Sequence, residues 1–217
     1  MRITAFLGHN NSWVKTIMLY FFVVSVLSYL IGGISNAVII SKRIYKKDIR
    51  DFGSKNAGAT NMLRVFGKKA GVSVLLLDML KGFAAVTLAR CVVAFFQAPY
   101  ECLLFAGFFA QVGHMFPAFF GFRGGKGVAT AAGSALGIMP LTALLLLVLF
   151  VALIAATKTV SLASGICAAV YPLFAFFLGN DKREYNFIFA AACAVMIGIK
   201  HIPNIIRLLD GEEKRLF

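Results

Sequence analysis

The stretch Gly127–Thr157 reads GVATAAGSALGIMPLTALLLLVLFVALIAAT and carries no charged side chain. A helix needs about 20 largely apolar residues to cross the hydrocarbon core of a bilayer. Pro140 follows Gly137 near the middle of the stretch, and the residue before a proline resists the α conformation. We therefore predict a break there and two short membrane spans, Val128–Met139 and Leu141–Thr157.

The 217-residue chain as a whole is apolar: it is 60% hydrophobic and 14% charged, with a mean hydropathy of +0.84. Ordinary soluble domains are about 45–50% apolar and about 25% charged. A single signal peptide does not explain apolar runs that recur along the whole chain. The sequence predicts an all-α integral membrane protein with seven transmembrane helices, two of them short. The other five spans are expected at Ile17–Ile40, Ala70–Gln97, Cys102–Phe119, Thr159–Gly179 and Tyr185–Ile199.

The distribution of basic residues predicts the orientation of these spans. The loop Lys42–Lys69 is the most basic segment, and basic loops of membrane proteins stay in the cytoplasm. Counting the spans from this loop places the N-terminus outside and the C-terminus in the cytoplasm. Residues 1–16 are expected to form a polar N-terminal arm, and residues 17–217 a single transmembrane domain.

The formal net charge of +13 would suggest nucleic acid as a partner of a soluble protein. Here the basic residues cluster in loops between apolar runs, so anionic headgroups and anionic substrates are the expected partners, and nucleic acid is not. The four cysteines form no C-x-x-C pair and show no zinc spacing, and we interpret them as packing residues. No metal and no cofactor are expected.

The first polar motif lies in the basic loop and runs from Gly53 to Asn61, followed by Arg64. Small residues let backbone N–H groups approach an anion, and an arginine can bind phosphate oxygens with two parallel hydrogen bonds. A flexible basic loop held at lipid headgroups is an equally good interpretation of the composition alone. The candidate phosphate ligands are Ser54, Asn56, Thr60, Asn61 and Arg64.

The second motif, Gly121–Thr130, reads GFRGGKGVAT. It resembles a phosphate nest that opens onto a helix N-terminus, which favours anions. It is not a Walker A loop, because Phe120 stands where the first glycine is required and Gly127 follows Lys126 in place of Ser or Thr. A plain Gly-rich turn between spans leaves the central lysine unexplained. The candidate phosphate-binding residues are Gly124, Gly125, Lys126 and Gly127.

Two shorter motifs follow. Lys158–Ser161 offers a hydroxyl group, but taken alone Ser161 is better explained as an N-cap at the start of the next helix. Lys200–Arg207 places His201 at the end of an apolar run, where it is either an interfacial residue or a group that orients a substrate hydroxyl or transfers a proton. Pro203 predicts an early end to this last helix.

Asp78, Lys81 and Arg90 interrupt the second predicted span, and His114 lies in the third. Asp78 and Lys81 share a helix face at i, i+3 spacing, which predicts a structural ion pair facing the bundle interior. His114 lies within the third span, and we interpret it as structural rather than catalytic. Known acyltransferase and hydrolase motifs are missing, because no histidine begins an H-x-x-x-x-D motif and no G-x-S-x-G sequence occurs.

Taken in order, the segments Ser54–Arg64, Gly113–Thr130, Val160–Ser164 and His201–Leu208 resemble the acyl-phosphate:glycerol-3-phosphate acyltransferases, the PlsY family. The resemblance covers nearly the whole chain beyond residue 16. It implies a seven-helix membrane bundle that transfers a fatty acyl group from acyl phosphate to glycerol 3-phosphate. The products are 1-acyl-glycerol 3-phosphate (lysophosphatidate) and phosphate, in the first acylation of phospholipid synthesis.

The resemblance also assigns roles to the motif residues. It implies that Lys126 and Arg64 are cationic phosphate ligands, with Ser54, Thr60 and the Gly124–Gly127 backbone lining the same pocket. Ser161 matches a substrate-contacting serine. His201 and Asn204 match the pair that positions glycerol 3-phosphate and the reacting groups. The candidate catalytic residues are therefore His201, Asn204, Ser161 and Ser54.

Lys55 departs from the family pattern, since a glycine is usual at that place, and its side chain is expected to point outward. The resemblance implies a monomer in the bacterial cytoplasmic (inner) membrane, with the active site facing the cytoplasm. The main alternative is a transporter of a phosphorylated or other anionic metabolite. Transporters usually hold their polar sites near the bilayer midplane and show internal repeats, whereas the polar motifs here belong to one face.

Overall fold

The structure, a computed structural model, describes residues 3–179 and 181–216, with side chains from residue 12 onward. Within these residues every regular element is helical. The elements are α1 (Ile3–Gly32), α2 (Asn36–Tyr45), η1 (Ile49–Asp51), α3 (Ala59–Phe66), α4 (Lys68–Phe96), α5 (Glu101–Met115), η2 (Ala118–Phe120), α6 (Val128–Ile138), α7 (Pro140–Thr157), α8 (Val160–Phe177) and α9 (Arg183–Leu209).

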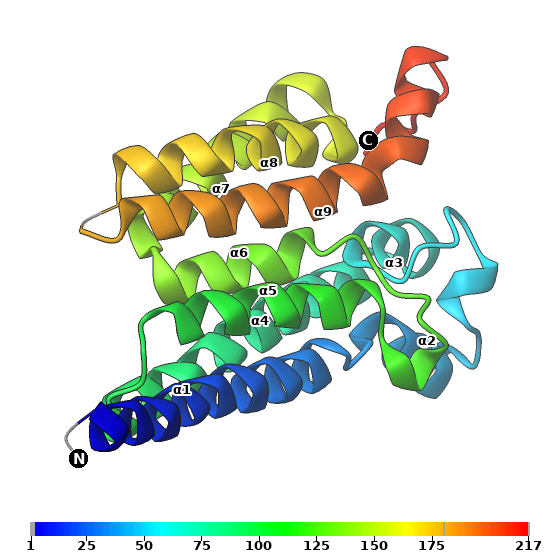
Figure 1. The fold of residues 1–217 in the computed structure, drawn as a ribbon. Helices are drawn as coiled ribbons and strands as arrows, with labels where there is room; N and C mark the ends of the chain where they lie inside the picture. The colour runs from blue at the N-terminus through cyan, green and yellow to red at the C-terminus, as the bar shows by residue number, and fades with distance from the viewer. Residues whose placement is uncertain (1–2, 180, 217) are drawn as a thin grey trace.

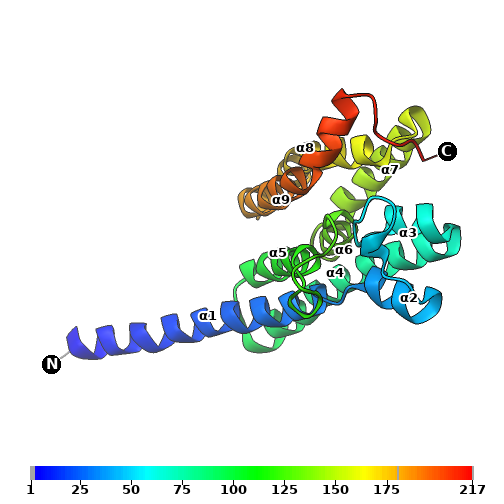
Figure 2. The ribbon, with the colours of Figure 1, turned by 90° about the vertical axis from the view of Figure 1, so that its right-hand side faces the viewer.

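The long helices lie side by side with their axes roughly aligned (Figure 1). One group contains α1, α4, α5 and α6, and a second contains α7, α8 and α9 (Figure 2). Helices α2 and α3 and the end of α9 lie at one end of the bundle, opposite the start of α1 (Figure 1). This end, which we call the loop end, therefore gathers segments that are far apart in the sequence.

Six stretches are long and apolar enough to cross a membrane, and α6 is a shorter apolar helix of 11 residues. The expected all-helical integral membrane architecture is confirmed at this level. The six stretches are Ser12–Tyr45, Lys68–Phe96, Glu101–Phe120, Pro140–Thr157, Val160–Phe177 and Arg183–Leu209.

The beginning of the chain differs from the expected arm and first span. Helix α1 already includes residues 3–16 and ends at Gly32, and α2 is a separate helix. The chain breaks at Gly32–Gly33 because glycine costs about 1 kcal/mol relative to alanine in a helix interior. The apolar run Ile17–Ile40 is therefore two helices rather than one.

The break predicted at Pro140 is confirmed. Helix α6 ends at Ile138, Met139 has φ −134° and ψ 72°, and Pro140 occupies the start of α7. Proline is well suited to a first helical position because its missing N–H has no partner there in any case. Within α7 only Thr142 is buried, so its apolar side chains are available to lipid.

Helices α4 and α6 approach each other closely at two glycines. A Cβ at Gly82 would lie 2.2 Å from the carbonyl oxygen of Thr130, and a Cβ at Gly133 would lie 1.9 Å from that of Met79. Small residues at such contacts let two helix backbones pack directly in a membrane. The pair of helices behind the candidate site is thus fixed by main-chain contact.

A buried cluster joins the two groups of helices. Leu104 of α5, Met139 beside α6, Tyr171 of α8 and Phe189 of α9 all belong to it. The rings of Tyr171 and Phe189 meet edge to face with centroids 6.3 Å apart. This cluster lies between α5 and α8–α9 and fixes where α8 and α9 stand relative to α6.

The expected early end of the last helix at Pro203 is wrong. Helix α9 continues through Pro203 to Leu209, and its final turns run in a different direction (Figure 2). A proline inside a helix removes one hydrogen bond and bends the axis without necessarily ending the helix. The bend carries Asn204 and Arg207 toward the loop end.

Candidate active site

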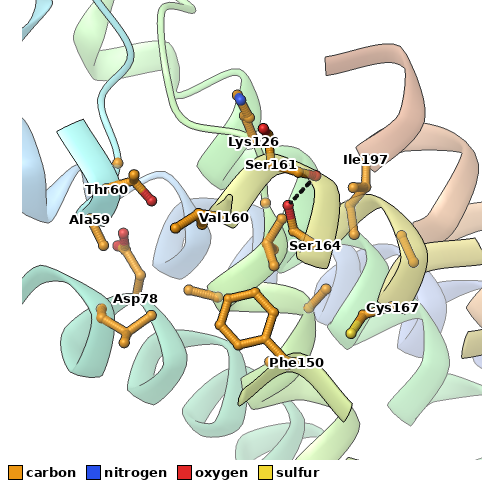
Figure 3. A pocket seen from close by; sticks show the side chains of 18 of the residues that line it. Ala59, Thr60, Asp78, Lys126, Phe150, Val160, Ser161, Ser164, Cys167 and Ile197 are labelled. Atoms are coloured by element: carbon orange, nitrogen blue, oxygen red, sulfur yellow. Dashed lines mark hydrogen bonds between the residues drawn. The ribbon is translucent and has the colours of Figure 1, made fainter. Parts of the chain in front are cut away.

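A cavity of about 310 Å³ lies at the loop end and continues between α4, α6, α7 and α8 (Figure 3). Residues from all four sequence motifs line it. Of the predicted site residues, the cavity brings together Ser54, Asn56, Thr60, Asn61, Arg64, Lys126, Gly127, Ser161, His201 and Asn204.

Asn61 holds the first motif together from within. Its Oδ1 accepts a hydrogen bond from the backbone N–H of Ser54 at 2.9 Å, and its Nδ2 donates to the carbonyl oxygens of Phe52 and Asn56 at 3.0 and 3.1 Å. The residue is 1% exposed. Its amide is thus occupied by the loop, so Asn61 shapes the site rather than offering free hydrogen bonds to a ligand.

Lys55 has φ +58° and an exposed side chain, which matches the expectation that it points outward. Glycine adopts this left-handed conformation without steric cost, whereas other residues lose about 1–2 kcal/mol. The loop therefore keeps a glycine-like turn although it carries a lysine at this position.

Arg64 extends from α3 toward the cavity. One of its terminal nitrogens donates to the carbonyl oxygen of Lys214 at 2.8 Å. Its Nε is buried and has no hydrogen-bond partner in the part of the chain that the structure describes. A buried guanidinium donor without a partner is suited to an anionic ligand oxygen.

Lys126 projects from the Gly-rich loop and donates a short hydrogen bond to Oδ1 of Asn204. Burial first of all, and then the cations of Arg207 and Arg64, lower the pKa of its ammonium group to about 8 against the opposing effect of the Glu213 carboxylate. The contact between Lys126 and Asn204 joins the second motif to the fourth.

Gly127 stands just before α6 with φ +82°, a left-handed backbone conformation that glycine tolerates.

Gly124 and Gly125 lie outside the cavity lining, contrary to their predicted role as phosphate ligands within the pocket wall. They pack against the last turn of α5, and the N–H of Gly125 donates to the carbonyl oxygen of His114 at 3.1 Å. Close packing against another helix, rather than an open nest, requires glycine at both positions.

Ser161 is not an N-cap. Thr159 occupies that position and Ser161 lies in the first turn of α8, where its Oγ donates to Oε1 of Glu213 at 2.8 Å. The same oxygen accepts from Nδ2 of Asn204 at 2.8 Å. Glu213 thus links the third motif to the fourth.

The sequence interpretation missed Glu213. Its second oxygen accepts from Nε of Arg207 at 2.9 Å, and its side chain is 4% exposed. Burial alone would raise the pKa of this carboxyl, but the hydrogen bonds from Ser161, Asn204 and Arg207 lower it below its usual value. Its place two residues after Gly211, beside the basic pair Lys214 and Arg215, was the one available signal.

Both ring nitrogens of His201 have partners. Nδ1 lies 2.9 Å from the carbonyl oxygen of Ile197 and Nε2 lies 3.0 Å from Oγ of Ser164. If the ring is neutral, Nδ1 donates to the carbonyl oxygen of Ile197 and Nε2 accepts from the Ser164 hydroxyl. If the ring is charged, both nitrogens donate, and the Ser164 hydroxyl donates instead to the carbonyl oxygen of Ser161 at 3.1 Å. Figure 3 shows this last contact. Ser164 is a second residue that the sequence interpretation missed.

The intramembrane pair predicted from spacing is confirmed. Nζ of Lys81 lies 2.9 Å from Oδ1 of Asp78, and both side chains are nearly inaccessible. Nδ2 of Asn36 donates to the same oxygen at 2.9 Å. Among the described residues no cluster of His, Cys, Asp and Glu could hold a metal ion.

Residues 22–211 match the family model described as glycerol-3-phosphate acyltransferase. The curated protein of that name from Fusobacterium nucleatum is 43% identical, and the match covers 90% of this chain and 97% of the relative. The one from Listeria monocytogenes is 44% identical, and the match covers 88% of this chain and 94% of the relative. Two crystal structures of PlsY (YgiH), described as an integral membrane glycerol 3-phosphate acyltransferase, are also similar. The glycerol 3-phosphate form has a TM-score of 0.82 at 38% identity, and the lysophosphatidic acid form 0.79 at 37%; each match covers 90% of this chain and 94% of the other.

Similarity in sequence and structure thus extends over about nine tenths of the chain, and the residues that match the family model include the cavity-lining residues from Ser54 to Asn204. The chain belongs to the glycerol-3-phosphate acyltransferase family.

Proposed function

We propose that this protein transfers a fatty acyl group from acyl phosphate to glycerol 3-phosphate, giving lysophosphatidate and phosphate. One observation carries the proposal: a single cavity joins a cationic, hydrogen-bonding end to an apolar arm. Both the donor and the product combine a phosphate with an acyl chain. The related structures are named for glycerol 3-phosphate, whose chemistry suits the polar end alone, and for lysophosphatidic acid, whose chemistry suits both ends.

The polar end is suited to phosphate. Arg64 offers a buried Nε without a protein partner, and Lys126 offers an ammonium group beside Asn204. Ser54 and Thr60 add hydroxyl groups to the same lining. Charged donors held in a partly buried site stabilise developing negative charge much more strongly than they would in water.

The apolar arm is suited to an acyl chain. It runs along Ala132 of α6 and is closed by side chains of α4, α7 and α8, including Met79, Leu147, Phe150 and Ala168. Its α7 wall is otherwise exposed to lipid. An acyl chain can therefore remain in apolar surroundings while its phosphate reaches the loop end.

The chemistry we propose is a direct transfer. The hydroxyl oxygen of glycerol 3-phosphate attacks the acyl carbon, the bond from that carbon to the phosphate oxygen breaks, and the leaving phosphate takes the hydroxyl proton. Since phosphate leaves readily, the protein has mainly to hold the two substrates in line. His201, with both nitrogens occupied, orients Ser164 and the start of α8.

An acyl-enzyme is the competing route, because Ser164 Oγ and His201 Nε2 form a serine–histidine contact. Rapid quenching of enzyme mixed with acyl phosphate alone, followed by mass spectrometry, distinguishes the two routes. Direct transfer yields no acylated peptide and leaves Ser164→Ala active. An acyl group on Ser161 or Ser164 that glycerol 3-phosphate removes would refute it.

The test of the proposed activity uses purified protein in detergent, palmitoyl phosphate and glycerol 3-phosphate, with no added metal. We expect lysophosphatidate and phosphate in equal amounts. The absence of product with acyl phosphate, together with product from acyl-CoA or acyl carrier protein, would reassign the donor. The absence of product with every donor, together with glycerol 3-phosphate uptake into proteoliposomes, would favour the transporter.

We also propose the topology of seven spans with the N-terminus outside, the C-terminus in the cytoplasm, and a monomer in the bacterial inner membrane. The supporting observation is that the basic loop 42–69 and the basic residues of the C-terminal tail share the loop end. Labelling of single cysteines at Lys55 and Gln97 from either side of the membrane tests the orientation. Lys55 should be reached from the cytoplasm only.

Filling the apolar arm should change acyl-chain preference. Ala132 is partly buried and lines the arm, so Ala132→Phe occupies space that the chain needs. We expect kcat/KM for palmitoyl phosphate to fall about tenfold or more relative to decanoyl phosphate, since each excluded methylene loses about 0.8 kcal/mol of burial. Ala152→Phe, an exposed site on α7 outside the cavity lining, is the control. Equal losses for both donors would contradict this placement of the chain.

The pH profile should reflect Lys126. Its ammonium form binds phosphate and predominates below its lowered pKa of about 8. We therefore expect kcat/KM to be full below that pH and to fall as pH rises through it. Lys126→Arg should move the decline upward, because a guanidinium stays charged throughout. An unchanged decline in that variant would assign it to another group.

A further inference from the structure

The histidine at the end of α5 lines the same cavity but has no role in the proposed reaction. We infer that His114, held against Asp78, is a positioning residue that sets the place of Lys126 by supporting the Gly-rich loop. The inference rests on the proposed function, because it concerns how Lys126 meets a substrate phosphate.

The first support is the contact between His114 and the two residues before Lys126. The N–H of Gly125 donates to the carbonyl oxygen of His114. A Cβ at Gly124 would lie 2.0 Å from that oxygen, and a Cβ at Gly125 would lie 2.1 Å from Nε2 of the His114 ring. The main chain that leads into Lys126 therefore lies directly on this residue.

The second support is that the first motif meets Gly125 at the same place. An added Cβ would also lie 3.0 Å from the carbonyl oxygen of Ala57, which belongs to the first motif. The loop thus packs at one point against both the His114 ring and the segment that leads into α3. A displaced ring would change the spacing between Lys126 and Arg64.

The third support is that the ring lies beside a fixed carboxylate. Its Nδ1 lies 3.7 Å from Oδ1 of Asp78, and that carboxylate is fixed by Asn36 and Lys81. Lys81 also donates to the carbonyl oxygen of Ile34 at 2.8 Å. The cluster ties α4, α5 and the break between α1 and α2 to one point beneath the loop.

A proton-accepting role for His114 fits these contacts less well. A general base must come within about 2.6–3.2 Å of the hydroxyl that it deprotonates. Nε2 is instead packed against Gly125, and the Asp78 carboxylate behind the ring is already neutralised by Lys81. The position of His114 is instead suited to contact with the Gly-rich loop.

The test compares His114→Ala with His114→Asn and His114→Gln, whose amide groups replace one ring nitrogen each. We expect the alanine variant to lose about 100-fold in kcat/KM, largely through a higher KM, because an error of about 1 Å in position costs that much. At least one amide variant should recover to within about tenfold. A general base would leave both amides as inactive as alanine, mainly through kcat.

Three further variants keep the outcome clear. If the histidine acts through Lys126, adding His114→Ala to Lys126→Ala should cost less than about threefold, since coupled residues are not additive. Tyr100→Phe removes a 2.8 Å hydrogen bond to Asn186 at the other end of α5 and controls for general destabilisation. Gly125→Ala moves the loop if His114→Ala does not fold.

A His114→Ala enzyme that loses only thermal stability, as Tyr100→Phe does, would overturn the inference. So would full additivity with Lys126→Ala, or a Gly125→Ala enzyme with unchanged KM. Inactivity of the wild-type enzyme toward acyl phosphate and glycerol 3-phosphate would instead reject the proposed function.

Discussion

Replacing Lys126 by alanine should lower the rate of lysophosphatidate formation by about 1000-fold. The ammonium group is the one cation of the Gly-rich loop that reaches the cavity, where it meets Asn204 and lies among the charges of Arg64 and Glu213. Removing one preorganised donor from an oxyanion site typically costs about 10²–10³ in rate. A cation on a bound phosphate adds ground-state attraction to that effect, so we expect kcat to fall and KM to rise together.

The measurement is steady-state kinetics with each substrate varied in turn, on protein whose folding is checked by thermal denaturation in detergent. Arg123→Ala is the matched control, because it removes a positive charge from the same loop at an exposed position outside the cavity. Lys126→Arg should retain part of the activity. Equal losses in Arg123→Ala and Lys126→Ala would reduce the role of Lys126 to general electrostatic attraction.

Glu213→Gln should lower kcat/KM by about 100-fold. The carboxylate accepts hydrogen bonds from Ser161 and Asn204 at one oxygen and from Arg207 at the other. Glutamine keeps one acceptor and replaces the other with a donor, so at least one of these contacts becomes a pairing of two donors. Asn204, which also contacts Lys126, then loses its fixed orientation. Leaving a buried polar group without its partner costs about 1–3 kcal/mol.

Glu212→Gln provides the control, since Glu212 is an exposed neighbour in the same tail. Kinetics with varied glycerol 3-phosphate separates two roles for the carboxylate. A loss of activity supports a positioning role. A Glu213→Gln enzyme with a lower KM for glycerol 3-phosphate and undiminished kcat would show instead that the carboxylate competes with the substrate for the cations of the site.

Much of the site could be predicted from sequence because its residues sit in short, chemically unusual segments. Lys126 between glycines and His201 at the end of an apolar run are exceptions in a chain that is 60% hydrophobic. The count of predicted spans also placed Lys126 and His201 at the same end of the bundle. Pro140 located the break between α6 and α7 because a proline restricts backbone geometry locally, whatever surrounds it.

Other features depend on contacts that no local pattern reveals. The sequence suggests Asn61 as a ligand, whereas in the structure its amide bonds to its own loop. It suggests Gly124 and Gly125 as part of a phosphate nest, whereas in the structure they pack against the end of α5. Glu213 is one acid among several in its tail, and only the fold brings it to Ser161. Helix ends were also hard to predict, since α1 and α2 share one apolar run and only Gly32–Gly33 separates them.

The glycine contacts between α4 and α6 have a mechanical consequence. Two backbones that touch at Gly82 and Gly133 cannot slide or separate without losing that fit, so this side of the molecule behaves as a rigid wall. The opposite wall is α7, which packs on α6 and α8 through few buried residues. Of the walls of the apolar arm, α7 is thus the one that buries least of its own surface, whereas the α4–α6 wall beside it is fixed by main-chain contact.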